Sequence, residues 1–267
     1  WLALGPRERR FAAQSNAFLT QRDMPPQLPW LEPEDPLPDP STAWGGDSPA
    51  PGLLAAGGAL GVPQLRAAYA QGTFPWFSAG QPILWWAPDP RMVLKVAEFR
   101  LHRSLRKTLN RFRADAACEI RIDSAFDQVI RSCSSTAREG QNGTWIVPAM
   151  VAAYEALHAQ GTAYSVETWV DGKLAGGLYC VAIGHAVFGE SMFAHATDAS
   201  KIALAALVCL CRRNGVELID CQQNTAHLAS LGAREIPRTT FIQHVKDQSS
   251  QPPIPWHFEP LYWNELL

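Results

Sequence analysis

The stretch AYSVETWVDGKLAGGLYCVAIGHAVFGES, residues 163–191, decides the fold. Two runs rich in β-branched and aromatic residues flank Asp171-Gly172, a dipeptide typical of the two-residue type I′ turn of a β-hairpin. HAVFGES (185–191) follows as a third strand. The stretch therefore predicts an antiparallel meander of three strands in the 267-residue chain.

Helices and further strands are expected on either side of this meander. Capping and breaking residues predict helices at about 103–113, from Ser124 as N-cap, from Pro148 to Gly161, and from the cap Asp198 through Arg213 to the stop at Gly215. VELIDC (216–221) predicts a buried strand, and IPRTTFIQHV (236–245) predicts another strand. This order of elements indicates an α+β fold with a mixed sheet.

The first third of the chain has a different composition. Proline dominates residues 23–52, which excludes regular helix and predicts an extended lead-in. A short helix is expected from Pro63 to Gly72, with three residues on one face, namely Leu65, Ala68 and Tyr69. We therefore divide the chain into an N-terminal extension (1–27), a small N-terminal domain (28–89) and a larger domain (90–267).

Composition and charge exclude several classes of protein. The 47% hydrophobic and 18% charged fractions are ordinary for a globular chain, and the apolar runs are too short to cross a bilayer. The N-terminal WLALGPRERRFAAQ has its Arg residues after its apolar stretch, the wrong order for a secretory signal. The six cysteines follow neither zinc-site nor disulfide spacing. We expect a cytoplasmic monomer that has no metal or other cofactor and is not bound to a membrane.

A basic segment, FRLHRSLRKTLNRFR (99–113), holds six of the 23 Lys and Arg residues. On a helix, Arg103, Arg106, Lys107 and Asn110 share one face and form a stripe suited to phosphate groups. A solvated helix face explains the segment equally well. Because the net charge is only −2, any contact with a nucleic acid has to be local.

Tryptophan is abundant, with ten in the chain. Trp76, Trp85, Trp86 and Trp145 lie between Gly and Pro residues in contexts that read as loops. Such side chains can line an apolar pocket or stack on a base. Trp85 and Trp86 fit an interdomain core better, whereas Trp76 and Trp145 are the stronger candidates for a pocket.

Polar residues within the predicted strands are the candidates for catalytic and substrate-binding residues. Glu190 interrupts the apolar strand VFGESMF and could bind a cation, although a solvent-facing position explains it equally well. Asp220 and Gln222 alternate around Cys221 at the end of a strand, so both should point to one face, at the edge where α/β sites lie. Neither GxxxxGK[ST] nor GxGxxG occurs, and the acyl-CoA-binding element of acetyltransferases is also absent.

A series of longer motifs runs in one order from about residue 28 to 240. They are GLLAAGGAL (52–60), AAYAQGTFPWF (67–77), PILWWAPDPRMVL (82–94), RSLRKTL (103–109), GTWIVPAM (143–150), AYEALHAQG (153–161), SVETW (165–169), LAGGLYCVAIG (174–184), FGESMF (188–193), DASKIAL (198–204), and LIDCQ with HLASLGAREIPR (218–238). This set resembles the leucyl/phenylalanyl-tRNA–protein transferases. Ala59 and Tyr164 depart from the family pattern, and Tyr164 could alter the polarity of a pocket.

The resemblance implies a small N-terminal domain followed by a GNAT-like mixed-sheet acyltransferase domain. It implies transfer of Leu or Phe, with Met as a further donor, from aminoacyl-tRNA to proteins that start with Arg or Lys, which marks them for N-end-rule degradation. The implied tRNA-binding residues are Arg103, Arg106, Lys107 and Lys201. The implied pocket and substrate residues are Tyr69, Trp76, Trp145, Tyr154, Leu178, Glu190 and Met192. Glu190 would face the basic residue of the acceptor, and Asp220 with Gln222 would sit at the reacting bond.

The chemistry of this reaction suits those residue types. An aminoacyl ester is already activated, so the enzyme mainly has to orient a neutral amine, and an α-amino group with a pKa of about 7.7–8.0 is partly neutral near pH 7. We therefore expect Asp220 to orient Gln222 and to polarise the amine rather than to remove a proton outright. Two other readings remain open, a ligase that adds amino acids from tRNA to cell-wall peptides and a non-catalytic RNA-binding module.

Overall fold

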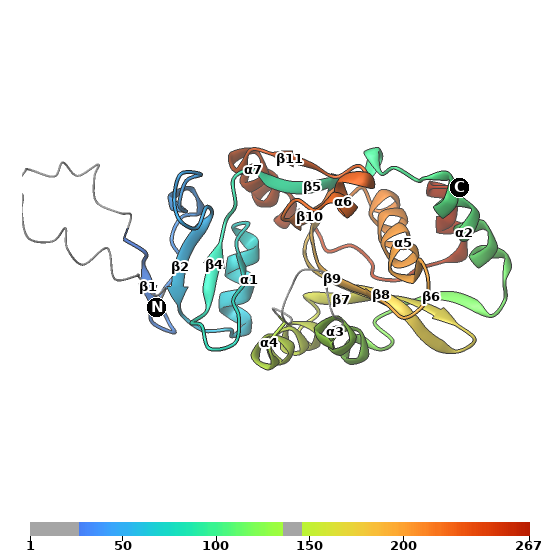
Figure 1. Ribbon diagram of the computed structural model, residues 1–267, viewed down its shortest axis with the longest axis horizontal. Helices are drawn as coiled ribbons and strands as arrows, with labels where there is room; N and C mark the ends of the chain where they lie inside the picture. The colour runs from blue at the N-terminus through green and yellow to red at the C-terminus, as the bar shows by residue number, and fades with distance from the viewer. Residues whose placement is uncertain (1–26, 136–145) are drawn as a thin grey trace, which may run out of the picture.

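The computed structural model describes residues 27–135 and 146–267, and it contains two β-sheets with helices packed around them (Figure 1). The small sheet has the strand order β1 (Trp30–Leu31), β2 (Leu53–Gly57), β4 (Leu84–Trp86) and β3 (Phe74–Pro75). The large sheet has the order β11 (Arg234–Ile236), β5 (Arg91–Lys95), β10 (Leu218–Gln222), β9 (Ala186–Ala194), β8 (Lys173–Ile183), β7 (Ala163–Val170) and β6 (Cys118–Ile122). The β9–β10 pair is parallel and its neighbours are antiparallel, so the expected mixed sheet of an α+β fold is confirmed.

The predicted meander forms the centre of the large sheet. Asp171 and Gly172 have φ values of 50° and 69°, both positive as a type I′ turn requires. The strand β8 pairs along most of its length with β7 on one side and β9 on the other. The stretch 163–191 therefore builds the three strands that were expected from it.

Helices cover both faces of this sheet (Figure 1). One face carries α3 (Phe126–Ser135) and α4 (Pro148–Ala159), and the other carries α5 (Ala199–Arg213). The basic helix α2 (Arg103–Ala114) lies beside β6 and α5 near the C-terminus. The remaining helices are α1 (Val62–Ala70), α6 (Ala226–Ser230), α7 (Arg238–Ser249) and the 3₁₀ turns η2 (Pro40–Thr42), η3 (Val96–Glu98) and η4 (Pro260–Glu265).

Two predicted caps are wrong in detail. Helix α3 begins two residues after Ser124, whose hydroxyl donates to Glu167 instead of capping the helix. Asp198 does occupy the N-cap position of α5, but its carboxylate bonds Lys201 rather than a helix N–H group. In both places the side chain that was expected to cap the helix forms a hydrogen bond with a nearby charged side chain instead of with the helix backbone.

The segment IPRTTFIQHV is not the strand that was expected. Only its first residue belongs to the short strand β11, and α7 begins at Arg238. Phe241 and Val245 are spaced four residues apart and are both buried, so they form the inward face of a helix. Burial of this face of the helix overrides the strand that was expected for the segment.

The small sheet was also missed, because the sequence indicated only a helix in this region. Trp85 and Trp86 belong to β4 and not to a loop. Trp85 is fully buried and its indole N–H donates to the Gly57 carbonyl at 3.0 Å, as a core residue requires. The expected helix between Pro63 and Gly72 is confirmed, with its predicted inward residues all buried.

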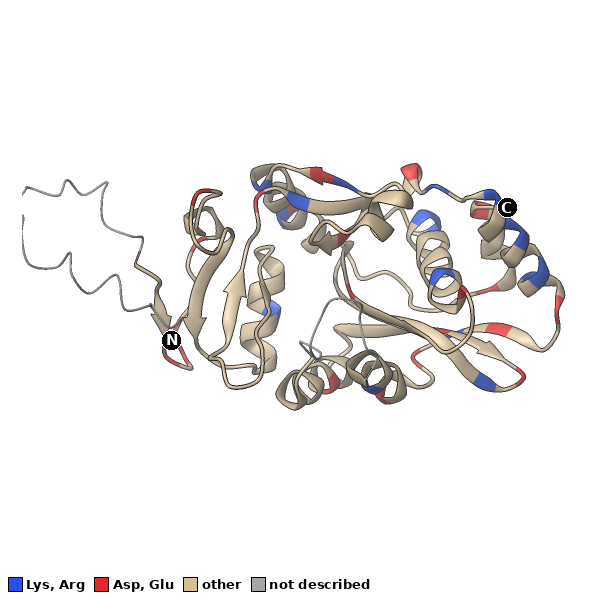
Figure 2. Ribbon diagram, in the orientation of Figure 1, with Lys and Arg blue, Asp and Glu red and all other residues tan. Residues whose placement is uncertain are grey.

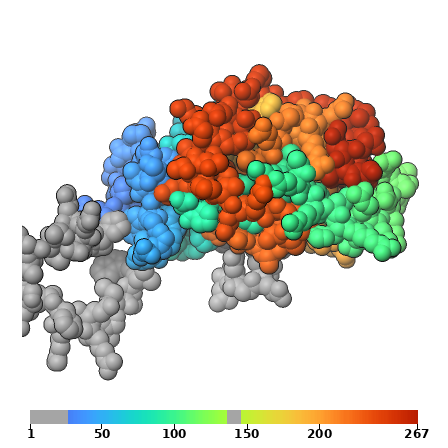
Figure 3. Space-filling model, turned by 90° about the horizontal axis from the view of Figure 1, so that it is seen from above, coloured from blue at the N-terminus to red at the C-terminus, as the bar shows by residue number. Residues whose placement is uncertain are grey.

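The two sheets share one hydrophobic core. Leu54, Tyr69 and Trp85 from the small sheet and its helix belong to the same buried cluster as Tyr179 and Phe188 of the large sheet. Seen from above, the N-terminal residues abut the orange and red C-terminal segments (Figure 3). The division into domains at residues 89 and 90 stays a prediction, since this core spans it. None of the helices in the described residues is both long and apolar enough to cross a membrane.

Glu167 on β7 ties the start of α3 to the sheet. This fully buried carboxylate accepts hydrogen bonds from the Ala125 backbone and the Ser165 hydroxyl through Oε1, each at 2.8 Å. It also accepts from the Trp169 indole at 2.8 Å and from the Ser124 hydroxyl through Oε2. All of these donors would lose their partner together if the carboxylate were removed.

We therefore expect Glu167→Ala to lower the free energy of unfolding by about 3 kcal/mol or more, because several buried donors are left unsatisfied. The matched control is Glu119→Ala on the neighbouring strand β6, where the carboxylate is 52% exposed and pairs with Arg121. That change should remain within about 0.5 kcal/mol. Urea unfolding of both variants measures the difference, and equal losses would contradict the role given to Glu167.

Candidate active site

A pocket opens where two parallel strands separate. The strands β9 and β10 pair only at Ile219 with Val187 and at Asp220 with Phe188. Beyond these pairs β9 follows β8 and β10 follows β5, so the two strands diverge towards their C-terminal ends. Side chains after the split line a cavity of about 330 Å³, which is the usual place for a site in an open α/β sheet.

Two β-bulges shape the walls of this pocket. On β9, Ser191 pairs with Tyr179 and Gly189 pairs with Cys180, so Glu190 is the extra residue between them. On β10, Asp220 pairs with Val93 and Gln222 with Met92, which leaves Cys221 as the extra residue. A bulge changes the direction of a strand and of its side chains. The side chains of β9 and β10 therefore do not simply alternate between the two faces of the sheet at Glu190 and Cys221.

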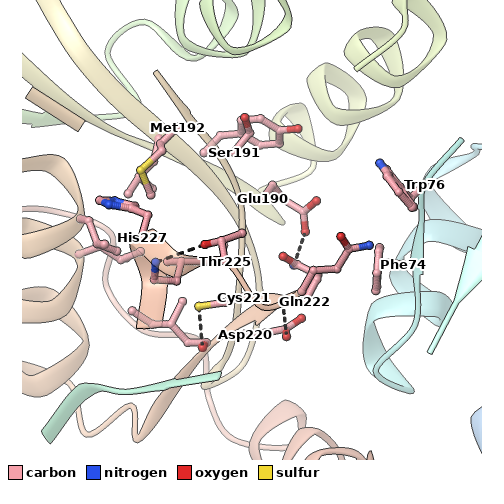
Figure 4. Close-up of a pocket in the computed structure, with 18 residues that line it drawn as sticks. Phe74, Trp76, Glu190, Ser191, Met192, Asp220, Cys221, Gln222, Thr225 and His227 are labelled. Carbon is pink, nitrogen blue, oxygen red and sulfur yellow. Dashed lines mark hydrogen bonds between the residues drawn. The ribbon is translucent and has the colours of Figure 1, made fainter. Parts of the chain in front are cut away.

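Glu190 lies near the centre of the site. Its Oε2 accepts a hydrogen bond from the Tyr154 hydroxyl at 3.1 Å. Its Oε1 accepts one from Gln222 Nε2 at 3.4 Å (Figure 4). Burial raises the pKa of Glu190 to about 7, against the hydrogen bonding of Tyr69 and Tyr154, which lowers it. The solvent-facing interpretation of this residue is wrong, because Glu190 lines a pocket and bonds two other side chains.

Asp220 is held in a buried ion pair. Arg91 Nε donates to Oδ1 at 2.7 Å and Arg91 Nη2 donates to Oδ2 at 2.6 Å, and both side chains are 1% exposed. Oδ1 also accepts the backbone N–H of Gln222 at 3.0 Å. Gln222 has a φ of 55°, a left-handed conformation that is uncommon outside Gly and that this hydrogen bond helps to hold. Asp220 and Gln222 are thus brought together, through a turn rather than through strand alternation.

The structure distributes the other expected pocket residues in two layers. Trp76, Leu178 and Met192 line the pocket, whereas Tyr154 and Tyr69 lie buried behind Glu190, with their hydroxyl groups bonded to each other. In Figure 4, Trp76 lies on one side of Glu190 and Met192 on the other. Trp145 lies outside the described residues.

The basic helix presents its charges outwards. Arg103, Arg106 and Lys107 on α2 are exposed, while Leu105 and Leu109 face the core. Figure 2 shows Lys and Arg residues along α2 and α5. No carboxylate of the described residues forms an ion pair with a Lys or Arg of the segment 99–113. Arg106 donates to the Leu266 carbonyl at 3.3 Å. A stripe of cations without a carboxylate partner suits phosphate groups and is also compatible with a solvated face.

Lys201 connects this helix to the pocket. Its Nζ donates to Asp198 Oδ1 at 2.7 Å, and Thr108 of α2 donates to Asp198 Oδ2 at 3.4 Å. Burial and the charge of Lys201 lower the pKa of His227, which lines the pocket. Asp198 therefore links α2 to Lys201, whose charge is felt by His227 at the pocket.

Sequence reasoning missed Arg91, Phe74 and His227. Arg91 is the most informative of these, since a buried Arg needs a carboxylate partner, but nothing local in PDPRM indicates which one. Tyr164 does not alter the pocket: its hydroxyl donates to the Gly161 carbonyl at 2.5 Å and its ring stacks on Trp256. Among the described residues, no group of three or more His, Cys, Asp or Glu side chains could hold a metal ion.

Comparison with known proteins shows the family of the chain. The family model described as leucyl/phenylalanyl-tRNA protein transferase matches residues 93–246, and the model of the N-terminal domain of that family matches residues 58–89. This chain belongs to the leucyl/phenylalanyl-tRNA protein transferase family. A leucyl/phenylalanyl-tRNA–protein transferase of Polaromonas sp. (strain JS666 / ATCC BAA-500) is 61% identical over 91% of this chain and 96% of that protein.

Other members of the leucyl/phenylalanyl-tRNA protein transferase family are similarly close. The proteins of that name from Albidiferax ferrireducens and Methylibium petroleiphilum are 61% and 59% identical, over 91% and 89% of this chain and 96% and 90% of those proteins. A solved structure, L-PGS from Bacillus licheniformis, aligns with a TM-score of 0.37 at 12% identity, over 73% of this chain and 62% of that chain. That likeness is too weak to carry an argument, so the assignment depends on the sequence relatives.

The Arg91–Asp220 pair should dominate the stability of this site. We expect Arg91→Met and Asp220→Asn each to lower the free energy of unfolding by about 3–5 kcal/mol, because each leaves a buried charge without its partner. The double variant should lose clearly less than the sum of the two, since it removes both charges. Denaturant unfolding of the four proteins measures the coupling, and strictly additive losses would show that the pair does not act as a unit.

Proposed function

We propose that this chain transfers a leucyl or phenylalanyl group from aminoacyl-tRNA to the N-terminal α-amine of proteins that begin with Arg or Lys. The observation that carries the proposal is an apolar pocket with Glu190 and Gln222 at the split of β9 and β10, in a chain of this transferase family. We also infer that Met is a minor donor, that the products enter N-end-rule degradation, and that the protein acts as a cytoplasmic monomer without a cofactor.

The donor side chain would occupy the apolar part of the pocket. Leu178, Met192 and Trp76 line it, together with further Leu and Ile residues of α5, α6 and β10, which are Leu204, Leu207, Ile219 and Leu228. Leu, Phe and Met are long and unbranched at Cβ, so they can extend into such a cavity. An apolar pocket separates similar side chains by only about 1–3 kcal/mol, which fits a site that accepts more than one donor.

The acceptor would be selected by charge. A carboxylate that is shielded from water attracts a guanidinium or ammonium group strongly, and Glu190 has no cationic side chain bonded to it within the described residues. Asp220, in contrast, has both carboxylate oxygens engaged by Arg91. Glu190 is therefore the carboxylate of the site that remains available for the basic side chain of an incoming N-terminal residue.

The reaction needs orientation more than a strong base. The neutral α-amine attacks the ester carbonyl carbon, the C–N bond forms, the C–O bond to the ribose breaks, and the ribose oxygen leaves with a proton lost by the amine. We assign Asp220 as a positioning residue that fixes the turn at Gln222, since its oxygens already accept bonds from Arg91 and from the Gln222 N–H. Gln222 would then face the reacting groups with its side-chain amide.

The tRNA would approach along α2. Arg103, Arg106 and Lys107 would contact phosphates of the acceptor stem. Lys201 would contact the part of the tRNA strand that leads into the pocket. Phosphate contacts of this kind supply affinity and position without reading bases. Support comes from the exposure of these cations and from the position of Lys201 beside His227 at the pocket.

The proposal predicts a change in acceptor choice for Glu190→Gln. The variant should lose about 2 kcal/mol of preference for Arg-start over Ala-start peptides, roughly thirtyfold in relative kcat/KM, because the charge-assisted bond is removed. The measurement is transfer of Phe from Phe-tRNA to peptides that begin with Arg, Lys or Ala, followed by mass spectrometry. Absence of any transfer by the wild-type protein would exclude the activity, and an unchanged preference in the variant would exclude the role of Glu190.

A second prediction concerns the basic helix. Replacing Arg103, Arg106 and Lys107 together by Ala should weaken tRNA binding, and the plot of log affinity against log salt should become shallower by roughly 0.9 for each lost phosphate contact. The control replaces three exposed cations elsewhere, Arg131, Lys173 and Lys246, by Ala and carries the same change in net charge. Equal effects of the two triple changes would mean that net charge, and not α2, determines the affinity.

A further inference from the structure

A chain of two buried tyrosines ends on Glu190. Tyr69 comes from α1 beside the small sheet and Tyr154 comes from α4, and both are 0% exposed. The Tyr154 hydroxyl has a single proton, which it donates to Glu190 Oε2 at 3.1 Å. The bond between the two hydroxyls must therefore be donated by Tyr69. Hydrogen bonding from Tyr69 also lowers the pKa of Glu190, so both hydroxyl groups act on this carboxylate.

The charge of Glu190 is balanced by groups from several elements. Burial is the largest influence and raises its pKa to about 7, and Asp220 of β10 also raises it. Hydrogen bonding from Tyr69 and Tyr154 and the charge of Arg91 on β5 lower it. From β8, Cys180 is a neutral neighbour, because burial raises the pKa of its thiol well above the ordinary value. The tyrosine hydroxyls are thus the main groups outside the Arg91–Asp220 pair that favour the carboxylate.

Packing alone does not explain the two hydroxyl groups. The Tyr69 ring lies 5.0 Å from the Phe188 ring and the Tyr154 ring lies 5.3 Å from the Tyr179 ring, centroid to centroid, inside the shared core. Phenylalanine would fill the same space without a buried polar group that has to be satisfied. The hydroxyls bond each other and end on Glu190, so their effect falls on that carboxylate.

We propose that Tyr69 and Tyr154 are positioning residues for acceptor selection, which hold Glu190 as a carboxylate aimed into the pocket and make the preference for a basic N-terminus depend on pH. This inference rests on the proposed role of Glu190 in binding the acceptor. It also gives the N-terminal region a part in the choice of acceptor, through Tyr69 of α1. Neither tyrosine has to touch the reacting groups for this effect.

The test compares two acceptor peptides that differ only in charge, one starting with Arg and one with citrulline, its neutral isostere. The ratio of their kcat/KM values is measured from pH 5.5 to 9, because kcat/KM reports ionisation of the free enzyme. Deprotonation of the α-amine affects both peptides alike and cancels in the ratio. For the wild-type protein, the preference for Arg should be small at low pH and rise as Glu190 ionises, with a midpoint near 7.

Removing a hydroxyl should shift this midpoint upwards. For Tyr154→Phe we expect a shift of roughly one pH unit, which is a tenfold loss of preference below the midpoint. Tyr69→Phe should shift it in the same direction, since hydrogen bonding from Tyr69 also lowers the pKa of Glu190. The matched control is Tyr164→Phe, which deletes a hydroxyl bonded to the Gly161 carbonyl and away from the pocket. That control should leave the midpoint unchanged.

A second measurement follows the charge of Glu190 without any substrate. A folded-state pKa raised above the ordinary 4.5 stabilises the protein fully below about pH 4.5, and this stability is lost as the pH rises through about 7. The unfolding free energy of the wild-type protein relative to Glu190→Gln should therefore fall across that window. The same comparison is made between Tyr154→Phe and the double variant Tyr154→Phe, Glu190→Gln. There the difference in unfolding free energy should continue to fall to higher pH.

The outcomes separate the two proposals. Upward shifts in both measurements support the inference. Unchanged midpoints in folded Tyr69→Phe and Tyr154→Phe proteins overturn it. A third outcome is a shift in the stability measurement together with a wild-type protein that shows no preference for Arg at any pH. In that case the tyrosines control the charge of Glu190, but Glu190 does not bind the acceptor. The tyrosines then have no role in acceptor selection.

Discussion

The ion pair between Arg91 and Asp220 is the constraint on which the site depends. Two parallel N–H···O bonds join the strands β5 and β10, and the guanidinium also lies 4.7 Å from the centroid of the Phe74 ring and 4.5 Å from that of Phe241. One buried cation therefore connects the large sheet, the small sheet and α7. Taking both charges out of water is costly, and the bidentate geometry with the aromatic contacts offsets much of that cost.

The same pair determines the form of the candidate active site. Because Asp220 also accepts the Gln222 N–H, the backbone turns into a left-handed conformation directly after the ion pair. That turn and the bulge at Cys221 direct Gln222 towards Glu190 across the split between the strands. The position of the Gln222 amide is thus fixed from outside the pocket, by a side chain 131 residues earlier in the chain.

Local signals explain which parts of this structure could be predicted. The Asp171-Gly172 turn and the helix that starts at Pro148 are specified by residues within a few positions of each other, and both were predicted correctly. The helix α7 and the bulge at Glu190 depend on partners elsewhere in the sheet, so periodicity gave the wrong element or none. Arg91 could be identified only from the structure. A buried Arg indicates that a carboxylate lies near it, but the sequence does not indicate which carboxylate.

The site holds two carboxylates that differ in their hydrogen-bond donors. Asp220 has a permanent cation at both oxygens. The donors that bond Glu190 in the part of the chain that the structure describes, Tyr154 and Gln222, are neutral. Under the proposed function, a basic N-terminal residue supplies the cation that Glu190 lacks. Binding and ionisation are then linked in both directions, since the cation favours the carboxylate and the carboxylate favours the cation by the same free energy. Discrimination against neutral acceptors follows from this linkage, because a neutral side chain would bury the charge of Glu190 without compensating it.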